Sequence, residues 1–244
     1  MSKNNKTVAI ILCGGEGSRL GRVGRKINKT LIKYKKKVLL EHIFEKLLKY
    51  KIYVVFLPVG YKHLSIKKLV KKNIFIKSKF KKMKITTNFT GFRTEIHQRI
   101  KQTIGQIPPD TSNIILINGD SYYDFNFKSI LKFHNQKKAY LTLVSCNKNI
   151  DYGLLKSQDQ KMISFNRNIK IKNFCSNDKN KFSFYSGLCI ISYAFLKHKI
   201  KKIKKNFEKE FFEAAIKSKK SYNFFTNKKF FDINTEIDLL HLEK

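Results

Sequence analysis

The sequence predicts an α/β fold: a doubly wound, mostly parallel (mixed) sheet with helices on both of its faces. Three observations predict it. Short apolar runs alternate with segments of helical periodicity, and the first apolar run ends in a glycine-rich loop that begins at Gly14. The chain has 244 residues, of which 42% are hydrophobic, which is enough to bury the core of one such domain. Strands separated by helices favour a parallel sheet, because each helix returns the chain to the edge from which it started.

Each predicted element rests on its own pattern. Apolar runs predict strands at Val8–Leu12, Ile52–Leu57, Ile85–Phe89, Ile114–Ile117, Ala139–Ser145 and Phe182–Ile191. Helical spacing predicts helices at Val38–Tyr50, Leu64–Lys72, Thr94–Ile104, Lys128–Asn135, Phe207–Ile216 and Thr235–Leu242. The sequence Pro108-Pro109-Asp110 marks a loop. Because there is no repeat and no flexible linker, we expect residues 1–244 to form a single domain.

The formal net charge of +35 raises the question of nucleic-acid binding. Only six of the 52 basic residues are arginine, and the chain is also rich in Asn, Ile, Phe and Tyr. These residues and Lys all have A/T-rich codons, so a coding bias would spread lysine over every exposed surface. We therefore expect a lysine-coated enzyme with no nucleic-acid partner, and keep a basic nucleic-acid binder as an alternative. The positive field would still favour anionic small substrates.

The patterns of cysteine, histidine and hydropathy argue against a disulfide-bonded, zinc-binding or membrane protein. The cysteines Cys13, Cys146, Cys175 and Cys189 form no C-x-x-C pair, so we expect reduced, mostly buried thiols. The histidines form no H-x-x-x-H pair, which argues against a zinc site. No apolar run approaches the roughly 20 residues of a membrane span, and the first run is too short for a signal peptide. We expect a cytoplasmic protein that does not bind membranes.

A glycine-rich loop, Gly14-Gly15-Glu16-Gly17, directly follows the first predicted strand. Glycine lets the backbone approach a ligand closely, and successive N–H groups in such a loop form a nest for phosphate oxygens. Ser18 and Arg19 come next, and the guanidinium group of Arg19 adds a permanent charge whose geometry suits those oxygens. An ordinary strand-to-helix turn would need only one or two glycines. The loop therefore predicts phosphate binding at the carboxyl end of the first strand.

Three better-known loops are excluded by spacing. The P-loop pattern G-x-x-x-x-G-K-[ST] is absent. The dinucleotide pattern G-x-G-x-x-G fails because Leu20 stands where its last glycine would be. Ser18 is not in a G-x-S-x-G context, so it is not the nucleophile of a hydrolase elbow.

The loop resembles the signature of the sugar-1-phosphate nucleotidyltransferases, L-x-G-G-x-G-[ST]-R-L with a lysine about ten residues beyond the arginine. Here the chain reads LCGGEGSRL, and Lys29 lies ten residues after Arg19. Lys26 is a competing candidate, although the spacing favours Lys29. The chain departs from the family in having Asn28 where proline is common before the lysine, and Lys36 in place of a glycine.

Four further motifs resemble the family in the right order along the chain. They are VGYK (Val59 to Lys62), ILINGDSYYDFNF (Ile115 to Phe127), YSGLCII (Tyr185 to Ile191) and FFDINTEIDL (Phe230 to Leu239). The resemblance implies a Rossmann-like nucleotidyltransferase fold. Its first half, to about Ser121, would hold the nucleotide, and the rest would shape the sugar site.

The resemblance also implies an activity and a set of residues. A sugar 1-phosphate would attack the α-phosphate of a nucleoside triphosphate, and pyrophosphate would leave in line. The implied nucleotide-binding residues are Leu12, Gly14, Gly15, Gly17, Ser18, Arg19, Lys29 and Gly119. Arg19, Lys29 and Asp120 would be catalytic. Asp120 and Asp232 would hold Mg²⁺, with no organic cofactor.

The sugar side of the site is less defined by the sequence. Arg167 lies where the family often has lysine, after Asn166 in place of a glutamate, and is a candidate for the sugar phosphate. Gly187 is a candidate for close approach of the sugar ring, or a plain strand glycine. The sequence leaves open the sugar, the nucleotide (CTP, GTP, UTP or dTTP) and a homo-oligomer. A nucleotide-binding regulatory relative that has lost turnover is a further alternative.

Overall fold

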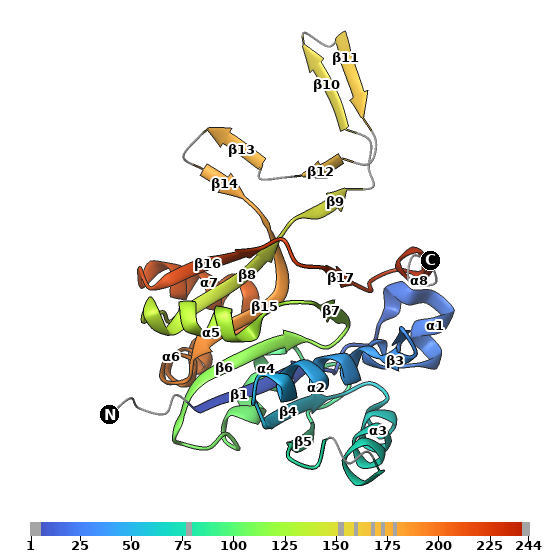
Figure 1. Ribbon diagram of the computed structural model, residues 1–244, viewed down its shortest axis with the longest axis vertical. Helices are drawn as coiled ribbons and strands as arrows, with labels where there is room; N and C mark the ends of the chain where they lie inside the picture. The colour runs from blue at the N-terminus through green and yellow to red at the C-terminus, as the bar shows by residue number, and fades with distance from the viewer. Residues whose placement is uncertain are drawn as a thin grey trace.

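The computed structural model describes residues 6–76, 80–150, 154–158, 161–166, 169–171, 174–177 and 180–240 (Figure 1). A seven-stranded sheet crosses the molecule in the order β16-β8-β15-β6-β1-β4-β5. Its strands are β1 (Lys6–Leu12), β4 (Val54–Val59), β5 (Lys84–Phe89), β6 (Thr111–Asn118), β8 (Leu141–Cys146), β15 (Phe184–Ser192) and β16 (Ser221–Thr226).

The sheet is mixed and mostly parallel, as predicted. β1 pairs in parallel with both β4 and β6, so that Ala9 lies opposite Val55 on one side and Ile115 on the other. β15 runs antiparallel to its neighbours β6 and β8, while β16 runs parallel to β8. Of the seven strands, β15 alone is therefore reversed.

Helices cover both faces of the sheet because the central strands are apolar on both sides. Ala9 and Ile11 of β1 pack in one core with helices α2 (Leu39–Lys49), α3 (His63–Ile76) and α5 (Phe127–Gln136). Val8 and Ile10 pack in a second core with α4 (Ile96–Ile104), α6 (Tyr193–Lys199) and α7 (Phe207–Lys217). Such double burial explains why β1 reads as an unbroken apolar run in the sequence.

The sequence located the main elements and missed the small ones. Each predicted strand and helix is present, with ends displaced by a few residues, and the run Phe182–Ile191 is divided between two strands. The edge strand β16, the helix α6 and the helix α1 (Gly21–Lys26) were not predicted. Tyr222 and Phe224 of β16 make edge contacts with Phe133 of α5, so the alternation of these aromatic residues was the available signal.

Six short strands between β8 and β15 were also missed. They are β9 (Lys148–Ile150), β10 (Leu154–Gln158), β11 (Lys161–Asn166), β12 (Ile169–Ile171), β13 (Phe174–Asn177) and β14 (Asn180–Phe182). β10 pairs with β11, β12 with β9, and β13 with β14, and all three pairs are antiparallel. In Figure 1 they extend from the ends of β8 and β15, outside the main sheet.

The prediction for the cysteines is confirmed at three of their four positions. Cys13, Cys146 and Cys189 are buried thiols that form no disulfide within the described chain, as predicted. Burial raises the pKa of the Cys189 thiol to about 12, so this group stays protonated at neutral pH. No described helix has both the length and the apolar character needed to cross a bilayer.

His134 makes the fold sensitive to acid. Its side chain on α5 is 2% exposed, and its Nδ1 atom lies 2.8 Å from the hydroxyl oxygen of Thr142 on β8. Burial lowers the pKa of His134 from 6.5 to about 4. Between pH 6.5 and about 4, His134 is protonated in the unfolded chain but neutral in the folded chain. The free energy of unfolding therefore falls as the pH drops through this range.

We predict that His134→Asn, which keeps a polar atom near the Nδ1 position, removes part of this pH dependence. The measurement is the free energy of unfolding in urea at pH 7 and pH 5 for the wild type, His134→Asn and the exposed control His198→Asn. The wild type and the control should lose more stability between the two pH values than His134→Asn. Equal losses in all three proteins would show that His134 is not the sensitive group.

Candidate active site

The predicted phosphate loop lies at the switch point of the sheet. From β1 the chain passes to β4 and β5 on one side, and then returns to β6 on the other. The loops after β1 and β6 therefore diverge and leave room for a ligand at their carboxyl ends. The two loops are tied together at their bases, because the N–H of Gly119 donates to the carbonyl oxygen of Leu12 at 3.1 Å.

The three glycines of the loop have different reasons for being glycine. Gly17 has a φ of 68°, a left-handed conformation that disfavours any side chain, and it caps the short helix η1 (Ser18–Leu20). Gly15 is exposed and has open space around its Cα. A Cβ atom on Gly14 would overlap the guanidinium group of Arg99. Close approach to a ligand therefore fits Gly15, whereas Gly14 is fixed by packing beneath the loop.

Lys29 lies inside the site, and Lys26 does not. Lys29 is 9% exposed on the short helix η2 (Lys29–Leu31), and its Nζ atom donates to the carbonyl oxygen of Ile233 at 3.3 Å. The same Nζ atom is 3.9 Å from a carboxylate oxygen of Asp120. Burial lowers the pKa of Lys29, and the nearby charge of Asp120 opposes that shift. Lys26 is exposed on α1.

Asn28, which stands where the family commonly has proline, ties three segments together. Its side-chain nitrogen donates to the carbonyl oxygens of Cys13 at 3.1 Å and Tyr61 at 2.9 Å. Its side-chain oxygen accepts from the backbone N–H of Thr30 at 3.0 Å and from the Thr30 hydroxyl at 2.9 Å. This departure from the family pattern therefore fixes the start of η2, which carries Lys29.

Asp120 and Asp232 are 112 positions apart in the sequence, but Asp120 directly precedes β7, the strand with which the strand of Asp232 pairs. Asp120 follows β6, and Asp232 ends β17 (Phe230–Asp232), which pairs antiparallel with β7 (Ser121–Tyr123) so that Asp232 lies opposite Ser121. The N–H of Ile233 donates to the carbonyl oxygen of Asp120 at 3.1 Å. These backbone contacts bring the C-terminal motif to the end of the central sheet.

The charges at this point are coupled. Burial is the main cause that raises the pKa of Asp120; the charge of Lys29 opposes the rise, and the carboxylate of Asp232 adds to it. Two neighbouring carboxylates are the kind of donor set that Mg²⁺ takes in proteins, with phosphate oxygens and water completing its shell. Among the described residues no group of three or more His, Cys, Asp or Glu side chains could hold a metal.

Arg19 and Ser18 are exposed on η1 at the rim of the site. A side-chain nitrogen of Arg19 lies 3.4 Å from the side-chain oxygen of Asn234, whose side-chain nitrogen in turn donates to Asp232. The charge of Arg19 also contributes to lowering the pKa of Lys29. Arg19 thus contacts the C-terminal motif through Asn234, while its charge stays accessible from solvent.

The predicted sugar-side residues are less informative. Arg167 lies outside the described residues. Gly187 has a φ of 74°, and a Cβ atom there would come within 2.5 Å of the side-chain nitrogen of Asn118. A backbone requirement thus accounts for this glycine, and its contact with a sugar stays a prediction.

Sequence reasoning missed Arg99 and the contribution of the VGYK motif. Arg99 is 5% exposed on α4 and reaches the carbonyl oxygen of Gly14. The N–H of Tyr61 lies 3.4 Å from the same carbonyl oxygen, and a Cβ atom on Gly60 would crowd both Arg99 and Gly14. Arg99 lies in the stretch TGFRTEIHQRIK, where an arginine among glycine and threonine was the signal available.

The chain is similar in sequence to curated sugar-phosphate nucleotidyltransferases. A heptose 1-phosphate guanylyltransferase (D-glycero-alpha-D-manno form) of Aneurinibacillus thermoaerophilus is 27% identical over 238 residues, covering 97% of this chain and 96% of the relative. Its namesake in Campylobacter jejuni is 32% identical over 155 residues, covering 64% of this chain and 65% of the relative.

Comparison of structures supports the fold alone. A crystal structure from Bacillus anthracis, of a protein assigned as a glucose-1-phosphate thymidylyltransferase, superposes with a TM-score of 0.70 at 17% identity. The match covers 97% of this chain and 93% of that one.

The family model described as "Nucleotidyl transferase" matches residues 8–242, nearly the whole sequence. The chain belongs to the nucleotidyl transferase family.

Proposed function

We propose that this protein joins a sugar 1-phosphate to the α-phosphate of a nucleoside triphosphate and releases pyrophosphate. The observation that carries the proposal is the meeting of Lys29, Asp120 and Asp232 beside the glycine loop at the switch point of the sheet. A phosphate oxygen of the sugar 1-phosphate forms the new bond to the α-phosphorus. The bond from that phosphorus to the bridging oxygen of the β-phosphate breaks, and the electron pair leaves with pyrophosphate.

The residues of this site act by position and charge. Two anions must approach each other, and the Coulomb repulsion between them is the main obstacle. Arg19 and Lys29 would neutralise the triphosphate, while the N–H groups of the glycine loop hold its oxygens. Asp120 and Asp232 would hold Mg²⁺, which supplies charge neutralisation on the reacting phosphates. No side chain has to form a covalent bond to the substrate.

Relatives guide the choice of substrates. The relative aligned over nearly its whole length carries the name of a guanylyltransferase for a heptose 1-phosphate. Shorter matches carry the names of glucose-1-phosphate adenylyltransferases and of a glucose-1-phosphate cytidylyltransferase. We propose GTP with a heptose 1-phosphate as the first pair to test, and expect the reaction in the cytoplasm.

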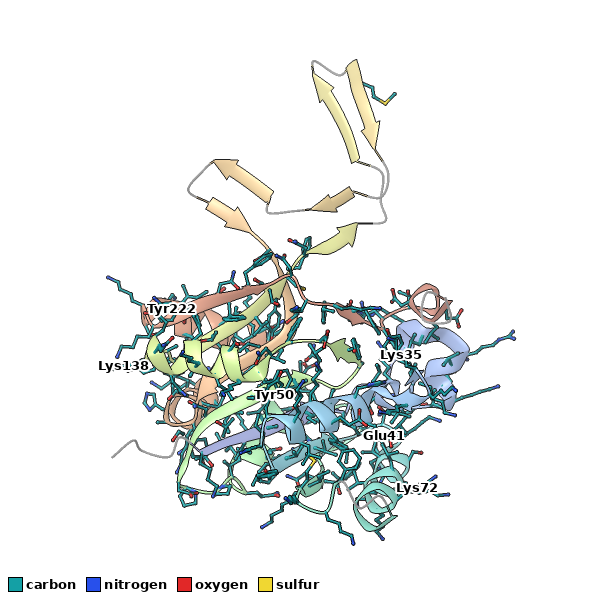
Figure 2. The ribbon with its side chains drawn as sticks, in the orientation of Figure 1. Lys35, Glu41, Tyr50, Lys72, Lys138 and Tyr222 are labelled. Carbon is teal, nitrogen blue, oxygen red and sulfur yellow. The ribbon has the colours of Figure 1, made fainter. Side chains whose placement is uncertain are left out.

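The positions of three lysines that Figure 2 labels are consistent with a lysine-coated enzyme. The labelled Lys35, Lys72 and Lys138 lie at separate places around the outside of the molecule in Figure 2, on the β2–β3 hairpin (Lys33–Tyr34, Lys37–Val38), on α3 and just after α5. Binding to a nucleic acid would favour lysines gathered on one face.

We predict that a matrix of GTP, CTP, UTP, dTTP and ATP against heptose, glucose and mannose 1-phosphates, scored by pyrophosphate release with Mg²⁺, has at least one productive pair. Turnover should depend on both substrates. A protein that binds nucleotides but releases no pyrophosphate with any pair would be the regulatory relative instead. Steeply salt-dependent binding to duplex DNA or RNA without turnover would favour the nucleic-acid alternative.

We predict that Lys29→Met lowers kcat/KM by about 10²-fold or more, because a charged contact to the transition state is lost. Methionine keeps the unbranched chain that packs beside Gly17, so the fold should persist. The matched control is Lys26→Met, which removes an identical charge three residues away at an exposed position and should stay within about threefold of the wild type. The reverse order of effects would show that Lys26, and not Lys29, is the lysine of the family signature.

We predict that Asp120→Asn and Asp232→Asn each give a folded protein with little turnover, since one neutral amide weakens a set of only two carboxylates. Excess Mg²⁺ should partly restore the weaker variant. The double variant should be little worse than the worse single one, because residues that act as a unit are not additive. Nearly full activity of Asp232→Asn beside an inactive Asp120→Asn would mean that Asp232 is not a ligand.

A further inference from the structure

Arg99 is a buried cation to which the sequence analysis assigned no role. Its side chain, 5% exposed, runs from α4 to the underside of the glycine loop. One terminal nitrogen donates to the Gly14 carbonyl oxygen at 3.1 Å. The other donates to the hydroxyl oxygen of Thr90 at 2.7 Å and to the carbonyl oxygen of Gly91 at 3.3 Å. None of the ion pairs in the described part of the chain includes Arg99, although burying a cation without a counter-charge is costly.

The contact with Gly14 sets the direction of a peptide group. The carbonyl oxygen of Gly14 and the N–H of Gly15 belong to one peptide unit, and in a trans peptide they point in opposite directions. Arg99 and the N–H of Tyr61 hold the carbonyl oxygen from beneath the loop. The N–H of Gly15 is thereby turned to the other side, where Gly15 is exposed and has open space.

The chain omits two side chains to make room for this guanidinium group. A Cβ atom on Gly14 would overlap it, and a Cβ atom on Gly60 would lie 2.8 Å from one of its terminal nitrogens. Gly60 and Tyr61 belong to the VGYK segment after β4, and Thr90 and Gly91 follow β5. Arg99 therefore joins the loops after β1 and β5 by hydrogen bonds and packs against the loop after β4.

We propose that Arg99 is a positioning residue for the nucleotide loop. It holds the Gly14 carbonyl oxygen away from the ligand, so that the Gly15 N–H faces the phosphates of a bound nucleoside triphosphate. Its positive charge makes no ion pair within the described chain, where the carboxylate of Glu95 only partly opposes the lowering of the Arg99 pKa by burial, and those phosphates would complete its balance. Without Arg99 the peptide can turn over and present a carbonyl oxygen to an anion, which repels it. This inference rests on the proposed function for the identity of the ligand.

The test compares Arg99→Met and Arg99→Lys with the matched control Arg25→Met, which removes an exposed arginine from α1. Arg99→Met should raise KM for the nucleoside triphosphate by about tenfold or more, and leave KM for the sugar 1-phosphate within about threefold. The rise in Tm on adding the nucleoside triphosphate without the sugar should shrink in the same variant. Arg99→Lys keeps the charge but not the fork of donors, and should fall between the wild type and Arg99→Met.

A second variant covers the case in which Arg99→Met fails to fold. Gly14→Ala leaves Arg99 in the chain but places a methyl group where the guanidinium lies, so it should raise the nucleotide KM as Arg99→Met does. Combining Gly14→Ala with Arg99→Ala should be no worse than the worse single change, because alanine at 99 frees the space. Additive losses would contradict the coupling.

The outcomes separate this inference from the proposed function. If the wild type releases pyrophosphate and Arg99→Met matches Arg25→Met in nucleotide KM and in the Tm rise, the positioning of the loop by Arg99 is wrong. If no pair of substrates gives pyrophosphate, but nucleoside triphosphates raise the Tm of the wild type and not of Arg99→Met, the inference stands and the proposed turnover is wrong. An equal rise of both KM values would assign Arg99 a general structural role instead.

Discussion

The site depends on one buried ammonium group, that of Lys29. Its Nζ atom lies between the carbonyl oxygen of Ile233 and the carboxylate of Asp120, so a single side chain joins three segments that are far apart in the sequence. Removing this charge from water is costly, and the carbonyl and the carboxylate offset part of that cost. The arrangement holds only if the C-terminal motif is anchored, which the pairing of β17 with β7 achieves.

The topology of the sheet explains why these segments can meet. The central strands β1 and β6 are parallel neighbours, so their carboxyl ends lie at the same edge. β1 delivers the glycine loop to this edge, and β6 delivers Asp120. Asn28 and Arg99 then hold the loop from beneath, each through bonds to backbone atoms of other loops. These bonds hold the base of the loop, and donors held in place in this way stabilise charge with little reorganisation.

The sequence predicted the features that are encoded locally. Apolar runs such as Val8–Leu12, which are buried on both faces of the sheet, identify central parallel strands. The glycine loop with Arg19 predicts phosphate binding. The pairing of β17 with β7 could not be read from three residues in each strand, because register is set by tertiary contacts. The resemblance to a family, rather than any local pattern, joined Asp120 to Asp232. The roles of Asn28 and Arg99 are long-range hydrogen bonds and leave no periodic signal in the sequence.

The most direct measurement is a crystal structure with Mg²⁺ and a nucleoside triphosphate whose α–β bridging oxygen is replaced by a methylene group, which prevents turnover. The account predicts the phosphates on the N–H groups of the glycine loop, within reach of Arg19 and Lys29, and the metal on Asp120 and Asp232. A triphosphate bound away from this loop, or a metal that contacts neither carboxylate, would contradict the central claim that these distant segments form one nucleotide site.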